Sequence, residues 1–171
     1  MAELTPQERL QPSLLDRLAD DEPEKSSEPP QKRVLTLQQL RESVIRDLDF
    51  LLNTDCLETT EDLDAFPHVA SSVVNYGVRG LSGAHTSTAD IAAIERNLKK
   101  AITTFEPRIL RDSVSVRVVL GEDEMNRHVM SLEIEGELWA QPLPLHLYLK
   151  TEVDLERGTV VVQESSGAEP R

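Results

Sequence analysis

The chain has 171 residues and a formal net charge of -13, from 31 acidic and 18 basic side chains. Such a surface repels nucleic-acid phosphates and anionic membranes, so bulk electrostatic binding to either is excluded as a main function. Hydrophobic residues make up 39% and aromatic residues 4%, which suits an aliphatic core but not a sugar- or base-stacking surface. Cys56 is the single cysteine, so an intrachain disulfide is impossible.

The amino-terminal sequence does not match a targeting or membrane segment. It has no basic start followed by an apolar run, as a signal peptide would have. No apolar stretch approaches the ~20 residues that a membrane-spanning helix requires. We therefore expect a soluble cytoplasmic protein with one domain and tails.

Residues 1–19 form an amino-terminal segment with one short predicted helix. Ser13 begins it as a cap with Asp16 three residues on, and its apolar stripe consists of Leu14, Leu15 and Leu18. A helix of about two turns is marginal in water unless it packs on something. It can fold back on its own domain or dock on a partner. Residues 20–35 are acidic and rich in Pro and Ser, which predicts a disordered linker and favours docking.

The main domain is expected over residues 36–164 and begins with two helical patterns. Thr36 and Gln39 have capping-box spacing, which predicts a helix from 37 to about 52 with an apolar stripe and a Glu42–Arg46 ion pair. The stripe consists of Leu37, Leu40, Val44, Leu48 and Leu51. Pro67 predicts a second, short helix that runs through Val69, Val73 and Val74 to Tyr76 and stops at Gly77.

A third helix is expected from a Ser87 cap to Phe105, with Glu95 paired to Lys99. Pro107 stops it, and the apolar period then changes from about 3.6 to 2 residues. Glu106, Pro107 and Arg108 stand at this change from helix to strand. Glu106 and Arg108 either form an ion pair that joins helix to sheet or present charges to a partner, and the partner interpretation is favoured slightly.

Four strands are expected after this point, over residues 113–120, 128–138, 143–153 and 159–164, with a disordered tail at 165–171. A tight second hairpin would place Ile134 opposite Leu147 and Glu135 opposite His146, with Glu133 near Lys150. The fold class is therefore α+β, with two to three helices packed on one face of a small antiparallel sheet. The last strand contains three consecutive valines without Pro or Lys, which predicts an edge open to strand addition; these are Val160, Val161 and Val162.

No arrangement of residues typical of an enzyme is present in the sequence. Four histidines lack metal-ligand spacing, so no metal or cofactor is expected; they are His68, His85, His128 and His146. Cys56 lies in an acidic loop, where neighbouring carboxylates make it a poor nucleophile. The glutamate row at 133, 135 and 137 is most simply a solvated face.

Three stretches together resemble a known family: RESVIRDLDFLLNT, SSVVNYGV and FEPRI followed by an alternating strand. They resemble the baseplate wedge family of contractile injection machines, and more narrowly the TssE family of the type VI secretion system. PSLLDRL near the amino terminus is also similar, so the resemblance covers about residues 9–163. One departure is Val78-Arg79-Gly80-Leu81, where the family often has Pro-Asp-Leu after the NYG motif.

The resemblance implies a structural, non-enzymatic role in a baseplate docked near the bacterial inner membrane. Its implied partners are the wedge subunits TssF, TssG and TssK and the sheath subunits TssB and TssC. The family's Glu-Pro-Arg motif falls on Glu106, Pro107 and Arg108 and implies wedge contacts there. An alternative is a regulatory anti-adaptor of the same fold that binds a response regulator. A peptidoglycan hydrolase, the older label of the family, is less favoured because no catalytic residues were found.

Overall fold

The computed structural model describes residues 13–18, 24, 35–80, 88–120, 129–140, 144–154 and 158–164. The predicted Ser87 cap, the predicted tail and nearly all of the predicted linker lie outside these ranges. The helices are α2 (Leu14–Leu18), α3 (Leu37–Leu52), α4 (Pro67–Ala70) and α5 (Thr88–Phe105). Three 3₁₀ turns, η2 (Leu57–Thr59), η3 (Val73–Asn75) and η4 (Arg111–Ser113), join them to each other and to the sheet.

Helix α3 begins and ends where its sequence signals predict. The Thr36 hydroxyl accepts a hydrogen bond from the Gln39 amide (3.1 Å), and the Gln39 side chain accepts one from the Thr36 amide (2.9 Å). This capping box satisfies amides that the first turn leaves without helical partners. The predicted stripe is buried except at Leu37, which lies in the first turn and is exposed.

The helix predicted from Pro67 to Tyr76 is shorter than expected. It ends after Ala70 because side chains take over the backbone groups that a longer helix would use. The Asn75 amide group donates to the Ala70 carbonyl (2.9 Å), and the Ser72 hydroxyl accepts from the Val74 amide (3.2 Å). Ser72 thereby begins the separate turn η3, and this turn orients its side chains differently from a continuous helix.

The sheet contains β1 (Ser115–Leu120), β2 (Val129–Leu138), β3 (Leu145–Asp154) and β4 (Thr159–Glu164), in the order β1-β2-β3-β4. All neighbours are antiparallel. The predicted register of the second hairpin is wrong by two residues, since Ile134 pairs with Leu149 and Glu135 with Tyr148. The connection is longer than a tight turn, and β3 begins at Leu145. A two-residue shift keeps every side chain on its predicted face, and Glu133 does lie opposite Lys150.

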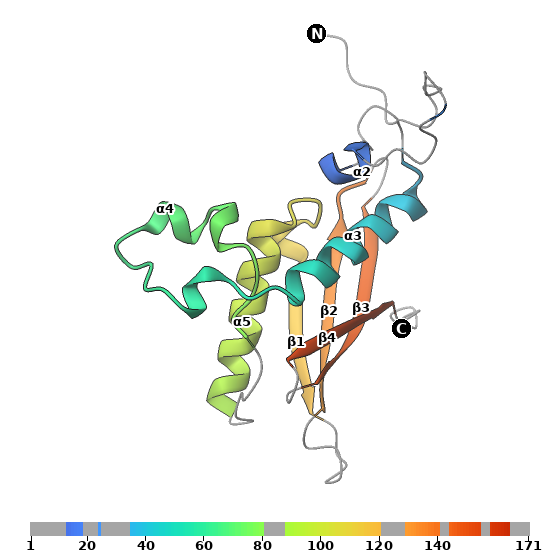
Figure 1. The fold of residues 1–171 in the computed structure, drawn as a ribbon. Coiled ribbons are helices and arrows are strands. Elements are labelled where there is room, and N and C mark those ends of the chain that lie inside the picture. Colours follow the sequence, from blue (N-terminus) through green and yellow to red (C-terminus); the bar gives the residue numbers. More distant parts are fainter. Residues whose placement is uncertain are drawn as a thin grey trace.

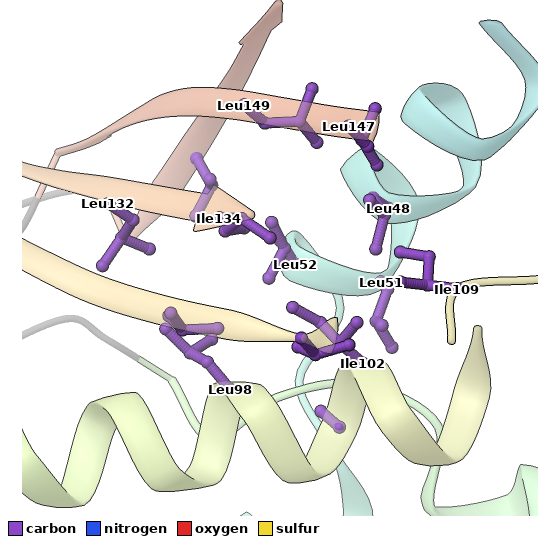
Figure 2. Packing of buried hydrophobic residues seen from close by; sticks show 14 of the residues in the cluster. Leu48, Leu51, Leu52, Leu98, Ile102, Ile109, Leu132, Ile134, Leu147 and Leu149 are labelled. Atoms are coloured by element: carbon purple, nitrogen blue, oxygen red, sulfur yellow. The ribbon is translucent and has the colours of Figure 1, made fainter. Parts of the chain in front are cut away.

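Helices α3 and α5 cover one face of the sheet, α5 beside β1 and α3 toward β4 (Figure 1). The core lies between these layers, and Figure 2 shows α3 and α5 side chains converging on those of the strands. Its largest fully buried side chains include Leu48, Leu51, Leu52, Leu98, Ile102, Leu132, Ile134, Leu147 and Leu149. The predicted α+β fold, with helices on one face of a four-stranded antiparallel sheet, is confirmed.

Candidate functional site

The residues at the change from helix to sheet form a charged cluster around Arg108. Helix α5 ends at Phe105, and the chain turns through Pro107 so that residues on both sides of the proline face each other. The Glu106 carboxylate, whose side chain is only 4% exposed, accepts from Arg108 Nε (2.7 Å), Arg108 Nη2 (2.5 Å) and the Arg108 amide (3.1 Å). Glu106 and Arg108 therefore pair with each other, which answers the question that the sequence left open.

Arg108 also reaches across to α3. Its Nη2 donates to Asp47 Oδ2 (2.6 Å), and its Nη1 donates to Ser43 Oγ (3.1 Å). Burial by itself lowers the pKa of the guanidinium, but hydrogen bonds and charges from Glu106 and Asp47 outweigh it and raise that pKa above its ordinary value. The cation therefore joins α3 to the start of the sheet. Of the motif residues, Glu106 is buried, Arg108 is half-buried and Pro107 is exposed, so only the last two can meet a partner directly.

The same region is tied to the sheet through its backbone. The Trp139 amide donates to the Arg108 carbonyl (2.7 Å), and the Leu110 amide donates to the Glu137 carbonyl (2.8 Å). These bonds flank a single bridge between Ile109 and Leu138 at the end of β2. The Glu-Pro-Arg segment is thus held by the sheet on one side and by α3 on the other.

Helix α2 extends the charged cluster to the amino-terminal segment. The predicted Ser13–Asp16 cap is present, with Ser13 Oγ donating to Asp16 Oδ2 (2.7 Å). Asp16 Oδ1 accepts from Arg46 Nη1 (2.6 Å), and Arg46 Nη2 donates to Asp47 (2.8 Å). The predicted Glu42–Arg46 pair is wrong, because Glu42 accepts from Gln38 instead.

Helix α2 folds back on its own domain, which is one of the two alternatives that the sequence left open. Its polar side lies on α3 through the Asp16–Arg46 ion pair, in which hydrogen bonding from the arginine lowers the pKa of Asp16. The same contact raises the pKa of Arg46. Leu14 and Leu18 point outward and are 75% and 74% exposed. The side chain of Leu15, the third predicted docking residue, lies outside what the structure describes.

A solvent-open cleft of about 370 Å³ lies over this cluster. The rings of Tyr76 and Phe105 form part of its wall and meet edge to face, with centroids 5.3 Å apart. The complete lining is Ser13, Asp47, Leu51, Tyr76, Phe105, Glu106, Pro107 and Arg108. The cleft therefore joins one end of α2, the charged cluster and an aromatic pair on one surface.

Different side chains bond to the backbone of the two edge strands, β1 and β4. At β1, the Val118 amide donates to the Glu95 carboxylate of α5 (2.9 Å), so Glu95 does not serve in the predicted pair with Lys99. At β4, the Asn53 side chain donates to the Val160 carbonyl and accepts from the Val160 amide, both at 2.9 Å. The edge predicted from the three valines is therefore closed at Val160 by Asn53, the residue that directly follows α3.

Alternation along β4 locates the part of the edge that remains open. Since the amide and carbonyl of Val160 point outward to Asn53, those of Val161 point inward to β3, and those of Val162 point outward again. The Val161 side chain is exposed on the sheet face away from the helices, and that of Val162 packs against the core. Val162 is thus the valine whose backbone can pair with another chain.

Those candidate chemical residues that the structure describes do not come together, and His85 and His128 lie outside the described ranges. Within the described ranges, no group of three or more His, Cys, Asp or Glu side chains could hold a metal ion. Cys56 is buried, with its sulfur 3.5 Å from Thr59 Oγ1, and His146 lies 3.1 Å from Glu135 on the exposed sheet face. None of the helices that the structure describes is long and apolar enough to cross a bilayer.

The sequence missed three polar residues that this geometry brings forward, Ser43, Asp47 and Asn53, and it assigned Glu95 to a different partner. Ser43 and Asp47 are four residues apart on α3, which places them on one helix face beside a buried stripe. That spacing was the available signal for a polar partner of Arg108. Asn53 and Glu95 gave no such signal, because each bonds to a strand far away in the sequence.

Comparisons with known proteins identify a family for this chain. The family model described as baseplate wedge protein gp25 matches residues 38–143. No curated protein matches the chain. A solved structure from Geobacter sulfurreducens, described provisionally as a tail lysozyme, is 16% identical and covers 78% of this chain and 100% of its own, with a TM-score of 0.42. That likeness is too distant to support an argument about function.

The matched region contains nearly all of α3, the segment between α3 and α5, α5 itself, the Glu-Pro-Arg segment and the first two strands. It covers more than half of the chain and includes the charged cluster around Arg108. The chain is therefore a member of the baseplate wedge protein gp25 family.

Proposed function

We propose that this protein is a structural component of a type VI secretion baseplate. In this proposal it joins the wedge formed by TssF, TssG and TssK, near the cytoplasmic side of the inner membrane. It then initiates the contractile sheath by accepting a strand from a TssB–TssC subunit. Family membership and the LLNT, NYG and Glu-Pro-Arg residues support the baseplate role, and the sheet edges support the strand-addition step.

The observation that carries the strand-addition step is the asymmetry between the two edges. A strand arriving at β1 would have to displace the Glu95 carboxylate from the Val118 amide, beside helix α5. A strand arriving at β4 meets the Asn53 cap at Val160 but finds outward backbone groups from Val162 onward. An added strand forms main-chain hydrogen bonds with such groups, so β4 is the edge suited to it.

The register also decides which substitution tests the proposal. A proline at Val161 would remove an inward amide that pairs with β3, so it would damage the fold itself. A proline at Val162 removes an outward amide and a partly buried side chain, but it leaves the backbone bonds to β3 in place. We expect Val162→Pro to abolish sheath assembly, measured by sheath fluorescence in cells and by binding of purified TssB–TssC, while wedge binding is retained.

Val161→Lys is the matched control, because its side chain points away from both the core and the edge backbone. It should leave sheath assembly within about twofold of wild type. The strand-addition step would be rejected if a folded Val162→Pro protein still assembled sheaths at the normal rate.

The surface over Arg108 is the proposed wedge contact. Pro107 is exposed there, and α2 adds the exposed Leu14 and Leu18 beside the same cluster. Co-purification of TssF, TssG and TssK with the full chain and with a variant lacking residues 1–33 tests this contact. Equal recovery with both proteins would assign α2 no part in wedge binding.

A further inference from the structure

Residues 57–76, between α3 and α5, are here named the arm. The arm carries an apolar surface separate from the exposed Leu14 and Leu18 of α2. The arm contains η2, α4 and η3 and projects sideways past α5, away from β4 (Figure 1). Three of its apolar side chains face solvent: Val73 is 82% exposed, Val74 65% and Phe66 59%. Large apolar side chains this exposed on one short folded segment are candidates for an interaction site.

Internal hydrogen bonds fix the shape of the arm. Asn75 is buried, its side-chain oxygen accepts from the Glu58 amide (2.9 Å), and its nitrogen donates to the Ala70 carbonyl (2.9 Å). One buried amide side chain thus joins η2, α4 and η3. The two exposed valines directly precede it in η3, so the contacts that bury Asn75 also hold these valines outward.

The base of the arm is closed by backbone pairing. The Cys56 amide donates to the Val78 carbonyl (3.0 Å), and the Val78 amide donates to the Thr54 carbonyl (2.8 Å). Gly77, which directly precedes Val78, has a φ of 125°, a conformation that other residues rarely adopt. Because the base and the interior are both fixed, the arm presents its apolar groups with little entropy left to lose on binding.

The charges around the apolar groups identify the kind of partner. The arm contains four carboxylates and no Lys or Arg. Glu58 is paired with Arg79 outside the arm (3.2 Å), whereas Glu61, Asp62 and Asp64 are exposed. These carboxylates give the arm a negative charge that repels a second copy of the arm and an anionic bilayer. It complements an apolar depression surrounded by Lys or Arg on another protein.

We infer that the arm is a second docking surface, which inserts Phe66, Val73 and Val74 into an apolar, basic-rimmed depression of a wedge subunit. This inference rests on the proposed baseplate function. It adds a contact separate from the Glu-Pro-Arg cluster and from the β4 edge. The protein then holds the wedge through the arm while β4 stays free for the sheath.

The test measures the affinity of the purified TssF–TssG–TssK complex for the Val73→Ser/Val74→Ser variant. We expect the Kd to rise at least tenfold, equivalent to about 1.4 kcal/mol. The urea midpoint should stay at the wild-type value, because both side chains are already exposed. Val161→Ser, which removes an exposed valine from the distant sheet face, is the matched control and should bind as wild type does.

Charge reversal provides an independent measurement on the same surface. Glu61→Lys/Asp64→Lys should weaken binding at low salt, and the salt dependence of its Kd should be smaller than that of wild type. A Val73→Ser/Val74→Ser Kd within twofold of wild type would overturn the arm inference and leave the baseplate proposal standing. Failure of the wild-type chain to bind the complex would overturn both. The arm inference would also be overturned if the wild-type chain formed a dimer and Val73→Ser/Val74→Ser were a monomer. In that case the occupant of the surface would be a second copy of this chain.

Discussion

Replacing Arg108 by alanine tests whether the charged cluster supports the fold or only displays charge. The change deletes four side-chain hydrogen bonds, two to Glu106 and one each to Asp47 and Ser43. The Glu106 carboxylate then keeps only the backbone amide of residue 108 as a donor among the contacts described above. Its surroundings stay closed, because the side chain is almost fully buried.

The cost follows from leaving a buried charge without its partner. Breaking such a pair from one side costs about 3 to 5 kcal/mol. Asp47 and Arg108 are each partly exposed, so water replaces part of what is lost, and we expect about 3 kcal/mol of lost unfolding free energy. For a chain of this size that lowers the Tm by about 6 to 12 °C.

Urea unfolding followed by circular dichroism gives the free energies for Arg108→Ala, Glu106→Gln and the double variant. Removing both charges relieves the unpaired carboxylate, so the double variant should be more stable than the sum of the single losses predicts, by about 1 to 2 kcal/mol. A loss below about 1 kcal/mol for Arg108→Ala, typical of an exposed ion pair, would refute the structural role. If Arg108→Ala lost wedge binding but kept its stability, the result would instead support a charge pair that contacts a partner.

Three further variants test other contacts. Asn53→Ala should cost about 1 to 3 kcal/mol in urea unfolding and increase aggregation measured by light scattering, because it frees both backbone groups of Val160. Gly77→Ala should cost at least about 3 kcal/mol by the same assay, since the new Cβ would lie 2.3 Å from a backbone carbonyl oxygen at a φ of 125°. Asp16→Asn should speed amide exchange over residues 14–18 about twofold to fivefold at pH 6, measured by NMR. The pKa of the Asp16 carboxyl is lowered in the folded state. The stability that its ion pair contributes is therefore fully present above the unfolded pKa of 3.8 and is lost as the pH falls through the folded pKa. The difference in exchange between Asp16→Asn and wild type should vanish in that acidic range.

Local signals in the sequence predicted the elements well. Thr36 and Gln39 located the start of α3, and Pro107 located the end of α5, because caps and proline act on neighbouring residues. Alternation predicted which strand residues face the helices. The hairpin register was wrong because a connection of unknown length can shift pairing by two residues without changing the face that each side chain occupies.

The contacts of the candidate site depend on groups far apart in the chain. Arg46 was assigned to a neighbour on its own helix, but the carboxylate of Asp16 lies closer to it in space. Glu95 was similarly assigned to its helix, although its carboxylate bonds to a strand. A pattern within one element predicts which neighbours are available, but it does not predict which distant group competes for them.

The asymmetric edges limit how many strands the sheet can gain. One edge is occupied by a carboxylate from α5, and the other is open only beyond its capped first half. A sheet open on both sides could extend in two directions and form a fibre. In the proposed strand addition at β4 alone, each molecule would begin a single row of added strands and would not itself be inserted into the middle of that row.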